Sequence, residues 1–291
     1  MRKTLIFELF LCAYLCFSPI IFSAARGENT AASIVYVGGS GPGNFTKIQD
    51  ALGNVTEGGT VYVLPGTYHE HLLITVPVHL VGVEKDTTIL DGDNQENVVI
   101  IAAEGCSVSG LTITDSGKTF PDAGILLTSD RNSISENILT GNYYGMRLES
   151  AQYNLISSNE IINNRRCGVY FSRSSHNTLT GNIVSNHSFN GFGLYEFSNN
   201  NTILENVLSR NNFSGVNIRD SMCNTVIDNR FIGDHVGIRV PPPEYKTVLQ
   251  GNVFTENPLN VEEGQDPMVF IGAGFTVFLL VVFLILRKKK T

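Results

Sequence analysis

Asp234 and His235 are the nearest approach in this sequence to an acid–base couple. They stand in the segment Gly233–Gly237, which reads GDHVG. A carboxylate beside an imidazole can move a proton in general acid–base catalysis. Adjacent residues of a strand point to opposite faces, however, and adjacent residues of a turn both face water. We therefore interpret the two as solvated turn residues, and we predict no catalytic set in this chain.

Three histidines offer the chemistry of metal ligation. His69 and His71 flank Glu70, and His79 follows. On a strand the first two imidazoles would share one side, where they could bind a borderline ion such as copper. Outside the first 25 residues, the methionines that could join a copper site are scattered: Met146, Met222 and Met268. We predict neither a metal site nor another cofactor.

Four carboxylates recur near one position of a repeat: Glu136, Glu160, Glu205 and Asp228. Two carboxyl groups about 5.5 Å or about 6.5–9.5 Å apart can hydrolyse a glycosidic bond. Ser158 and Gly181 interrupt the series. We favour a solvated polar bend over a catalytic pair.

A candidate binding face consists of side chains that recur at a spacing of about one repeat. Its residues are Arg147, Tyr170, Tyr195, Asn217 and Arg239. A second row holds Glu149, Arg173 and Arg219. Aromatic rings beside planar guanidinium and amide groups suit stacking on a sugar chain and hydrogen bonding to it. The same residues could instead simply cover a flat sheet, and both interpretations stay open.

The elements that position these residues come from a repeat that runs from Asn132 to Asn257. Its inner asparagines are separated by 22 to 24 residues: Asn137, Asn159, Asn182, Asn206, Asn229 and Asn252. A fixed period of this size indicates a solenoid. Short apolar-alternating runs with β-branched residues predict two or three strands in each copy. A leucine-rich repeat would need a leucine consensus and a helical half that are not found, so the pattern favours an all-β parallel β-helix.

Two columns of this repeat have expected roles. The inner asparagines would turn inward and hydrogen-bond to their neighbours above and below in a ladder. A glycine column would occupy a second bend that needs a positive φ or close packing. Its members are Gly145, Gly168, Gly193 or Gly191, Gly215 and Gly237.

The segment before the regular repeats predicts a cap for the first coil. Residues 46–49 read TKIQ, which is a capping box with Thr46 as N-cap and Gln49 at N3. Phe45, Ile48 and Leu52 would lie on one side of a two-turn helix that ends at Gly53. Such a helix would plug the open end of the stack, where an uncovered strand edge invites association. We also expect the insertion at residues 118–124 to project from the stack.

The N-terminal third carries a family resemblance in three segments: Phe45–Ala51 (FTKIQDA), Gly58–Tyr68 (GGTVYVLPGTY) and Val78–Val83 (VHLVGV). These resemble the start of pectate-lyase-like proteins, and the Asn-rich coils resemble the NosD branch, over about residues 33–260. The resemblance implies a single-stranded right-handed parallel β-helix of 22–24-residue coils. Its functions range from lyases, hydrolases, esterases and epimerases to surface proteins without activity, and NosD itself is a copper-maturation factor. The clustered aspartates with an arginine, the Gly-His-Gly and the Asp-Pro-His of the enzymes are missing here.

Both ends of the chain are hydrophobic. Residues 1–25 have a basic start, an apolar stretch and small residues, which predicts a secretory signal peptide, or an uncleaved anchor as the alternative. Residues 268–286 carry no charge and precede the basic tail 287–291, which predicts a membrane span with a cytoplasmic C-terminus. Between them we place the cap and first coils at 26–96, the regular repeats at 97–257 and a linker at 258–267. The coil stack would then lie in the extracellular or periplasmic space.

Charge and cysteine content narrow the possible partners. Without the signal peptide and the tail, the chain has 14 basic and 26 acidic residues, a net charge near −12 that argues against nucleic acid. Cys106, Cys167 and Cys223 lie at least two coils apart, so we predict three free, mostly buried thiols. We expect a membrane-anchored surface protein that binds an envelope polysaccharide or a surface protein. The alternatives are a polysaccharide lyase or hydrolase, and a NosD-like accessory factor in copper-enzyme maturation.

Overall fold

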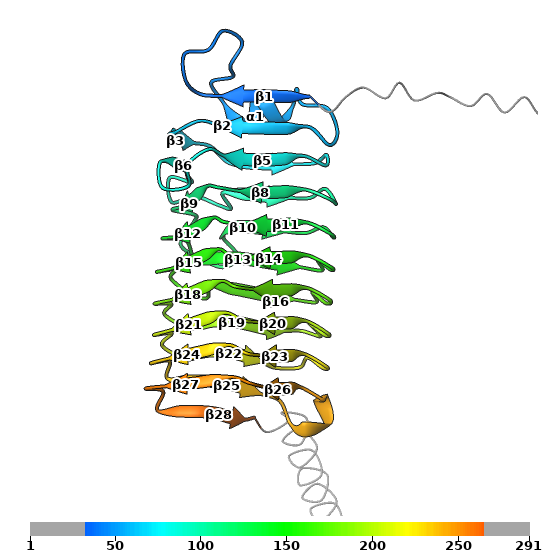
Figure 1. Cartoon of the computed structure of the whole chain (residues 1–291), viewed down its shortest axis with the longest axis vertical. Helices are drawn as coiled ribbons and strands as arrows, with labels where there is room; N and C mark the ends of the chain where they lie inside the picture. Colours follow the sequence, from blue (N-terminus) through cyan, green and yellow to red (C-terminus); the bar gives the residue numbers. More distant parts are fainter. Residues whose placement is uncertain (1–32, 265–291) are drawn as a thin grey trace, which may run out of the picture. The chain divides into compact units, whose positions relative to one another are not determined.

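The computed structural model describes residues 33–264, and these form a stack of parallel β-coils (Figure 1). The predicted signal peptide and the predicted membrane span lie outside the described residues. No helix within residues 33–264 is long and apolar enough to cross a bilayer. The all-β prediction is confirmed, and the coils wind with the right hand that parallel β-connections adopt.

Three parallel sheets run along the stack. Each complete coil contributes one strand to each sheet, and β1 adds one further strand to sheet A. Sheet A contains β1 (Ile34–Val37), β2 (Thr60–Val63), β5 (His79–Gly82), β8 (Ser107–Ser109), β11 (Ser133–Ser135), β14 (Leu155–Ser157), β17 (Thr178–Thr180), β20 (Thr202–Leu204), β23 (Thr225–Ile227) and β26 (Val248–Gln250). Sheet B contains β3 (Gly66–His69), β6 (Thr88–Asp91), β9 (Thr112–Thr114), β12 (Ile138–Thr140), β15 (Glu160–Ile162), β18 (Ile183–Ser185), β21 (Val207–Ser209), β24 (Arg230–Ile232) and β27 (Val253–Thr255). Sheet C contains β4 (Leu72–Ile74), β7 (Val99–Ile101), β10 (Ala123–Leu127), β13 (Tyr144–Glu149), β16 (Val169–Ser172), β19 (Asn190–Tyr195), β22 (Ser214–Ile218), β25 (Val236–Val240) and β28 (Leu259–Glu263). The short helices are α1 (Ile48–Leu52) and η1 (Pro243–Tyr245), and β28 falls inside the predicted linker 258–267.

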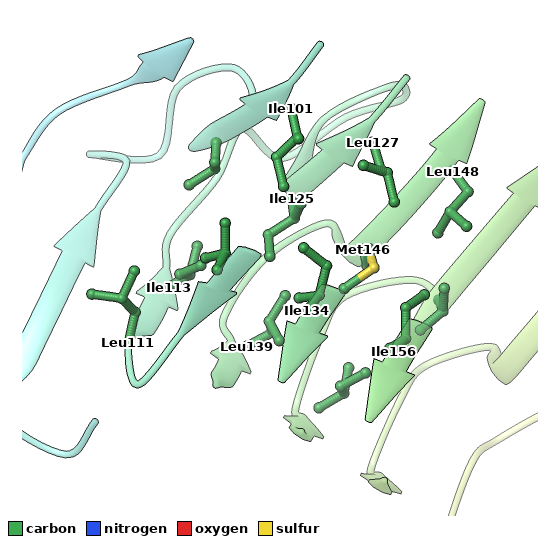
Figure 2. Close-up of a cluster of buried hydrophobic side chains, with 14 of the residues drawn as sticks. Ile101, Leu111, Ile113, Ile125, Leu127, Ile134, Leu139, Met146, Leu148 and Ile156 are labelled. Carbon is green, nitrogen blue, oxygen red and sulfur yellow. The ribbon is translucent and has the colours of Figure 1, made fainter. Parts of the chain in front are cut away.

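The core fills the interior of the stack. The short strands of sheets A and B send their central residue inward, so one apolar side chain per strand stacks on its equivalent in the next coil. Ile134, Leu139 and Met146 face one another from three sheets of the same coil and are fully buried (Figure 2). Such stacking makes each coil depend on its two neighbours.

The predicted asparagine ladder is confirmed. The backbone N–H and the Nδ2 of Asn182 both donate to Oδ1 of Asn206, at 2.9 Å each, and Nδ2 also donates to the carbonyl of Ile156. A parallel ladder runs through Asn132, Asn154, Asn177, Asn201 and Asn224. A third ladder, which the sequence analysis missed, runs through Asn142, Asn164, His187, Asn211, Asp234 and Asn257.

Each ladder residue turns inward after a residue with left-handed backbone. The predicted glycine column does not supply these left-handed positions. The residue before each ladder asparagine has a positive φ, as at Glu136, Ser158 and Gly181. The column of Gly145 and Gly168 does not have a positive φ and is required for close packing instead. A Cβ on Gly168 would lie 2.7 Å from the carbonyl oxygen of Gly191, which makes Gly191, not Gly193, the column member.

The helix α1 forms where it was expected but with a different cap. Ile48 and Leu52 are buried, Phe45 packs against the core, and Gly53 ends the helix. The predicted capping box is wrong, because the N-cap is Lys47 and makes no side-chain hydrogen bond. The carboxylate of Glu70, a residue of the β3–β4 turn, accepts hydrogen bonds from the first two helical N–H groups, at 2.8 and 3.0 Å. That the helix plugs the stack stays a prediction.

Candidate functional site: a groove on sheet C

A groove of about 510 Å³ lies along the outer side of sheet C. Its floor comes from outward residues of the sheet C strands, and its wall comes from the turns that precede them. We call it the sheet C groove. Its lining residues are Phe120, Tyr144, Arg166, Cys167, Tyr170, Phe189, Tyr195, Phe213, Asn217, Ile218, Arg219, Asp220, Arg239, Val240, Pro241, Pro242, Tyr245 and Gly264. Phe120 belongs to the insertion 118–124 and is 63% exposed, as expected of a projecting loop.

A column of three tyrosine rings forms the floor of the groove. The ring centroids of Tyr144 and Tyr170 are 5.0 Å apart, and those of Tyr170 and Tyr195 are 5.2 Å apart. This spacing is close to the step between coils, which is about 4.8 Å. The three rings come from strands of adjacent coils, β13, β16 and β19, so the floor is an aromatic strip that crosses three coils.

Tyr195 reaches this strip from the neighbouring row. Tyr170 pairs with Gly193, and Tyr195 pairs with Ser172. Because Gly193 has no side chain, the Tyr195 ring lies over it, with Cε2 2.6 Å from where a Cβ would stand. Nδ2 of Asn190 donates to the Tyr195 hydroxyl at 2.6 Å and fixes the ring. Tyr195 thus lies two positions beyond the row of Tyr170 and Asn217, and its ring folds back onto that row.

The wall of the groove is a stack of two rings between two guanidinium groups. The rings of Phe189 and Phe213 are stacked at 4.5 Å. The Arg166 guanidinium lies 3.9 Å from the Phe189 ring centroid, and that of Arg239 lies 4.3 Å from the Phe213 centroid. These cation–π contacts hold both arginines beside the groove. Of the residues in this wall, the sequence analysis singled out only Arg239.

The structure brings together four of the five predicted face residues. Tyr170, Tyr195, Asn217 and Arg239 line the groove. Arg147 does not line it, because its side chain is buried beside the sheet and its Nη1 pairs with Glu149 at 2.7 Å.

The predicted second row is only partly correct. Glu149 pairs with Ser172, so Arg173 lies in the turn after the row, where it pairs with Glu196 at 2.9 Å. Arg219 lines the groove, with its guanidinium 5.4 Å from the Tyr195 ring centroid and its Nε 3.3 Å from Asp220.

Burial keeps the ionisable groups of the floor neutral. It raises the pKa of the Tyr144, Tyr170 and Tyr195 phenols, so all three remain hydroxyl donors at neutral pH. It also raises the pKa of the Cys167 thiol to about 11, so the thiol under the floor is not a nucleophile at neutral pH. The predicted free thiols are confirmed for Cys106, Cys167 and Cys223, although Cys223 is exposed.

Carboxylates are scarce in the groove. Among the lining residues only Asp220 has one, and it pairs with Arg219. Three of the four carboxylates of the predicted polar bend, those of Glu136, Glu205 and Asp228, are exposed at turn positions with positive φ. The fourth, Glu160, starts β15 and belongs to another column. The described residues therefore offer no paired carboxylates in this groove.

Asp234 is not the solvated turn residue that we expected. It is fully buried as a member of the third ladder, while His235 is exposed. Burial raises the pKa of Asp234 from 3.8 to about 6. His187, which lies two steps away in the same ladder beyond Asn211, is also buried, and burial lowers the pKa of its imidazole from 6.5 to about 4.

The three histidines considered as metal ligands have separate partners. The chain turns at Glu70, so the expected strand bearing His69 and His71 on one side does not form. The Nδ1 atom of His71 bonds to the carbonyl of Asn97, and that of His79 bonds to the Ser107 hydroxyl. The imidazole of His69 faces two carboxylates, with Nδ1 2.8 Å from Asp93 Oδ1 and 3.9 Å from Asp91 Oδ2.

Comparisons with known proteins identify both a family and a fold. The sequence matches the family described as periplasmic copper-binding protein (NosD) over residues 81–269. No curated protein matches the sequence.

Among solved structures, the catalytic domain of a GH87 alpha-1,3-glucanase in complex with nigerose has a TM-score of 0.65 and 16% identity. The match covers 79% of this chain and 46% of that domain, so the chain spans about half of the glucanase domain. A pectate lyase has a TM-score of 0.60 and 15% identity, over 80% of this chain and 79% of the lyase. A pectin methylesterase in complex with a hexasaccharide has a TM-score of 0.54 and 13% identity, over 79% and 92%. At these identities the likeness shows the fold alone.

Proposed function

The chain belongs to the NosD family, and we propose that it is a membrane-anchored surface protein whose sheet C groove binds a glycan chain. The observation that carries this proposal is the tyrosine strip, with Tyr144, Tyr170 and Tyr195 at centroid spacings of 5.0 and 5.2 Å. Tyr170 is half-buried and is the most accessible of the three rings, so it can stack on a sugar ring, while the buried Tyr144 and Tyr195 hold it in place on either side.

Hydrogen-bonding groups beside the strip suit the same ligand. Asn217 and the arginines of the wall supply donors, and the tyrosine hydroxyls remain protonated. Two of the similar solved structures hold saccharides: a glucanase with nigerose and a methylesterase with a hexasaccharide. Residues 268–286 would hold the coil stack at the cell surface, with the basic tail 287–291 in the cytoplasm.

Binding without catalysis is the form of the proposal that the groove favours. Its lining residues include one carboxylate, Asp220, which is already paired at 3.3 Å. Hydrolysis of a glycosidic bond normally uses two. A lyase or hydrolase is the alternative, and release of a shortened product would reveal it.

The test is a glycan array and polysaccharide panel with the full-length protein in mild detergent. We expect Tyr170→Ala to weaken binding by about tenfold, since the stacking on one ring is lost. Tyr153→Ala is the matched control, because Tyr153 is 52% exposed and does not line the groove. Absence of binding to every glycan would overturn the proposal, and product release would replace it with the enzymatic alternative.

The copper named in the family description finds no dedicated centre among residues 33–264. Their one suitable group is His69, Asp91 and Asp93, whose ligand atoms lie within 4.8 Å of one another. Imidazole and carboxylate are acceptable copper ligands. The side chains of His69 and Asp93 are more than half exposed and are already bonded to each other, and His69 precedes the matched residues 81–269. The group does not fit a family copper centre, so we derive no copper chemistry from it.

A further inference from the structure

The sheet C groove departs from the rest of the domain in charge. Residues 33–264 contain 13 basic and 24 acidic residues, a net charge of −11. The groove lining reverses this balance, with Arg166, Arg219 and Arg239 against Asp220. Positive charge gathered in one cleft of an acidic domain attracts negatively charged ligands to that cleft.

Two of the three arginines have carboxylate partners. Arg219 Nε lies 3.3 Å from Asp220 Oδ2. Arg239 Nη2 lies 2.6 Å from Glu262 Oε1. Both charges are thereby compensated, so they add hydrogen-bond donors to the groove but little net charge.

Arg166 is the arginine whose charge stays uncompensated. No carboxylate oxygen of the described residues lies within 4.0 Å of its guanidinium. The guanidinium instead lies by its face on the Phe189 ring, at 3.9 Å from the centroid. A guanidinium stacked in this way keeps its N–H edge available for a planar or tetrahedral anion.

The position of Arg166 ties this charge to the tyrosine strip. The backbone N–H of Arg166 donates to the carbonyl of Tyr143 at 2.8 Å, and the next residue, Cys167, packs in one cluster with Tyr144 and Tyr170. A saccharide stacked on Tyr170 would therefore hold its substituents near the Arg166 guanidinium.

We propose, on the basis of the glycan-binding function above, that the groove selects a glycan with an isolated anionic substituent that binds Arg166. The substituent is a carboxylate, sulfate or phosphate on an otherwise neutral saccharide. One uncompensated cation can pair with one such group, and the net charge of −11 repels densely charged polymers such as nucleic acids.

The experiment uses the full-length protein on an array of matched glycan pairs, such as lactose and sialyllactose. Each neutral glycan is paired with counterparts that carry one carboxylate, one sulfate or one phosphate, and these arms identify the anion. We expect about tenfold tighter binding of at least one charged series, and a smaller preference at 0.5 M salt.

Substitution at Arg166 assigns the preference to its guanidinium. Arg166→Gln should remove about tenfold of the affinity for the charged series and weaken binding of the neutral glycans much less, because glutamine keeps an N–H donor but not the positive charge. Arg165→Gln is the matched control, because Arg165 is the exposed neighbour and does not line the groove. Equal binding of neutral and charged glycans, or equal effects of the two variants, would overturn this inference and leave glycan binding standing. Absence of binding by both classes would overturn glycan binding itself.

Discussion

Replacing Asp234 with asparagine should stabilise the protein at neutral pH. In the third ladder, Asp234 Oδ1 accepts hydrogen bonds from the backbone N–H and Nδ2 of Asn211, both at 2.8 Å. Its other oxygen, Oδ2, is buried without a partner. At the equivalent atom, Asn211 and Asn257 have an amide that donates to the carbonyls of Val184 and Phe231.

The strand register identifies the backbone carbonyl to which the side chain at position 234 makes no hydrogen bond. Val184, Leu208 and Phe231 are paired in sheet B, so the equivalent carbonyl for position 234 is that of Leu208. A protonated carboxyl or an amide can donate to this oxygen, whereas a carboxylate presents a second acceptor to it. The ladder therefore favours the neutral acid, which agrees with the raised pKa of Asp234.

The size of the effect follows from that pKa. A shift from 3.8 to about 6 corresponds to about 3 kcal/mol of unfolding free energy at a pH above both values. The contribution of a group whose pKa is raised in the folded state is present below 3.8 and is lost as the pH rises through about 6. Asp234→Asn should thus add about 3 kcal/mol at pH 7.5 and about 1 kcal/mol or less at pH 4.

The assay is denaturant unfolding of the full-length protein, followed by far-ultraviolet circular dichroism at several pH values between 4 and 7.5. Asp228→Asn is the matched control, because Asp228 is exposed at a position with φ 54° that asparagine tolerates. We expect it to change stability by about 0.5 kcal/mol at most. A loss of stability in Asp234→Asn at pH 7.5, or the same gain at pH 4 and pH 7.5, would refute the reasoning.

His187 gives this experiment a second signature. Its pKa is lowered in the folded state, so its contribution is lost as the pH falls from 6.5 towards about 4. In the wild type this slope opposes that of Asp234 between pH 4 and 6. Once Asp234 is replaced, stability should decline on acidification, because the His187 term is then no longer offset.

Two further predictions concern the stack. Asn182→Ala removes three donated hydrogen bonds and the acceptor for Asn159, and should cost about 4 kcal/mol of unfolding free energy. Asn252→Ala, in the last coil, should cost about half as much. Equal losses of stability for the two variants in thermal or denaturant unfolding would contradict the ladder argument. Gly168→Ala should lower the unfolding free energy by more than about 2 kcal/mol, because its Cβ would meet backbone at 2.7 Å. Gly53→Ala is the control, because the nearest contact of its Cβ would be 3.5 Å. Equal melting temperatures of the two variants would show that the glycine column is not tightly packed.

The architecture could be predicted from the sequence because the same residue types recur at the same position of every repeat. Six asparagines from Asn137 to Asn252 at one spacing can satisfy their amides only in a stack of equal coils. The third ladder was missed because His187 and Asp234 interrupt its asparagines. The interval between Asn142 and Asn164 equals the interval between Asn137 and Asn159, and this match could have revealed the third ladder.

The parts of the site that could not be predicted depend on contacts between distant residues. Tyr195 lies on the strip only because its ring folds over Gly193, and strand alternation gives no sign of this. The wall needs Arg166 and Phe189 to be stacked across a coil step, although each reads as an ordinary turn residue in the sequence. The cap of α1 likewise comes from Glu70, more than 20 residues away, which outcompetes the local capping box.

The coil-by-coil pairing of the sheets ties the length of the groove to the number of coils. Each strand of sheet C pairs with the equivalent strands of the adjacent coils. Duplication of one coil within the regular region would repeat every ladder contact and lengthen the groove by about 4.8 Å, close to the length of one sugar unit. Under the proposed glycan binding, an in-frame duplication or deletion of a single coil would therefore change the length of glycan that fits the groove while the fold stays the same. Selectivity for ligand length in such a protein can evolve through the gain or loss of repeats, without a new binding residue.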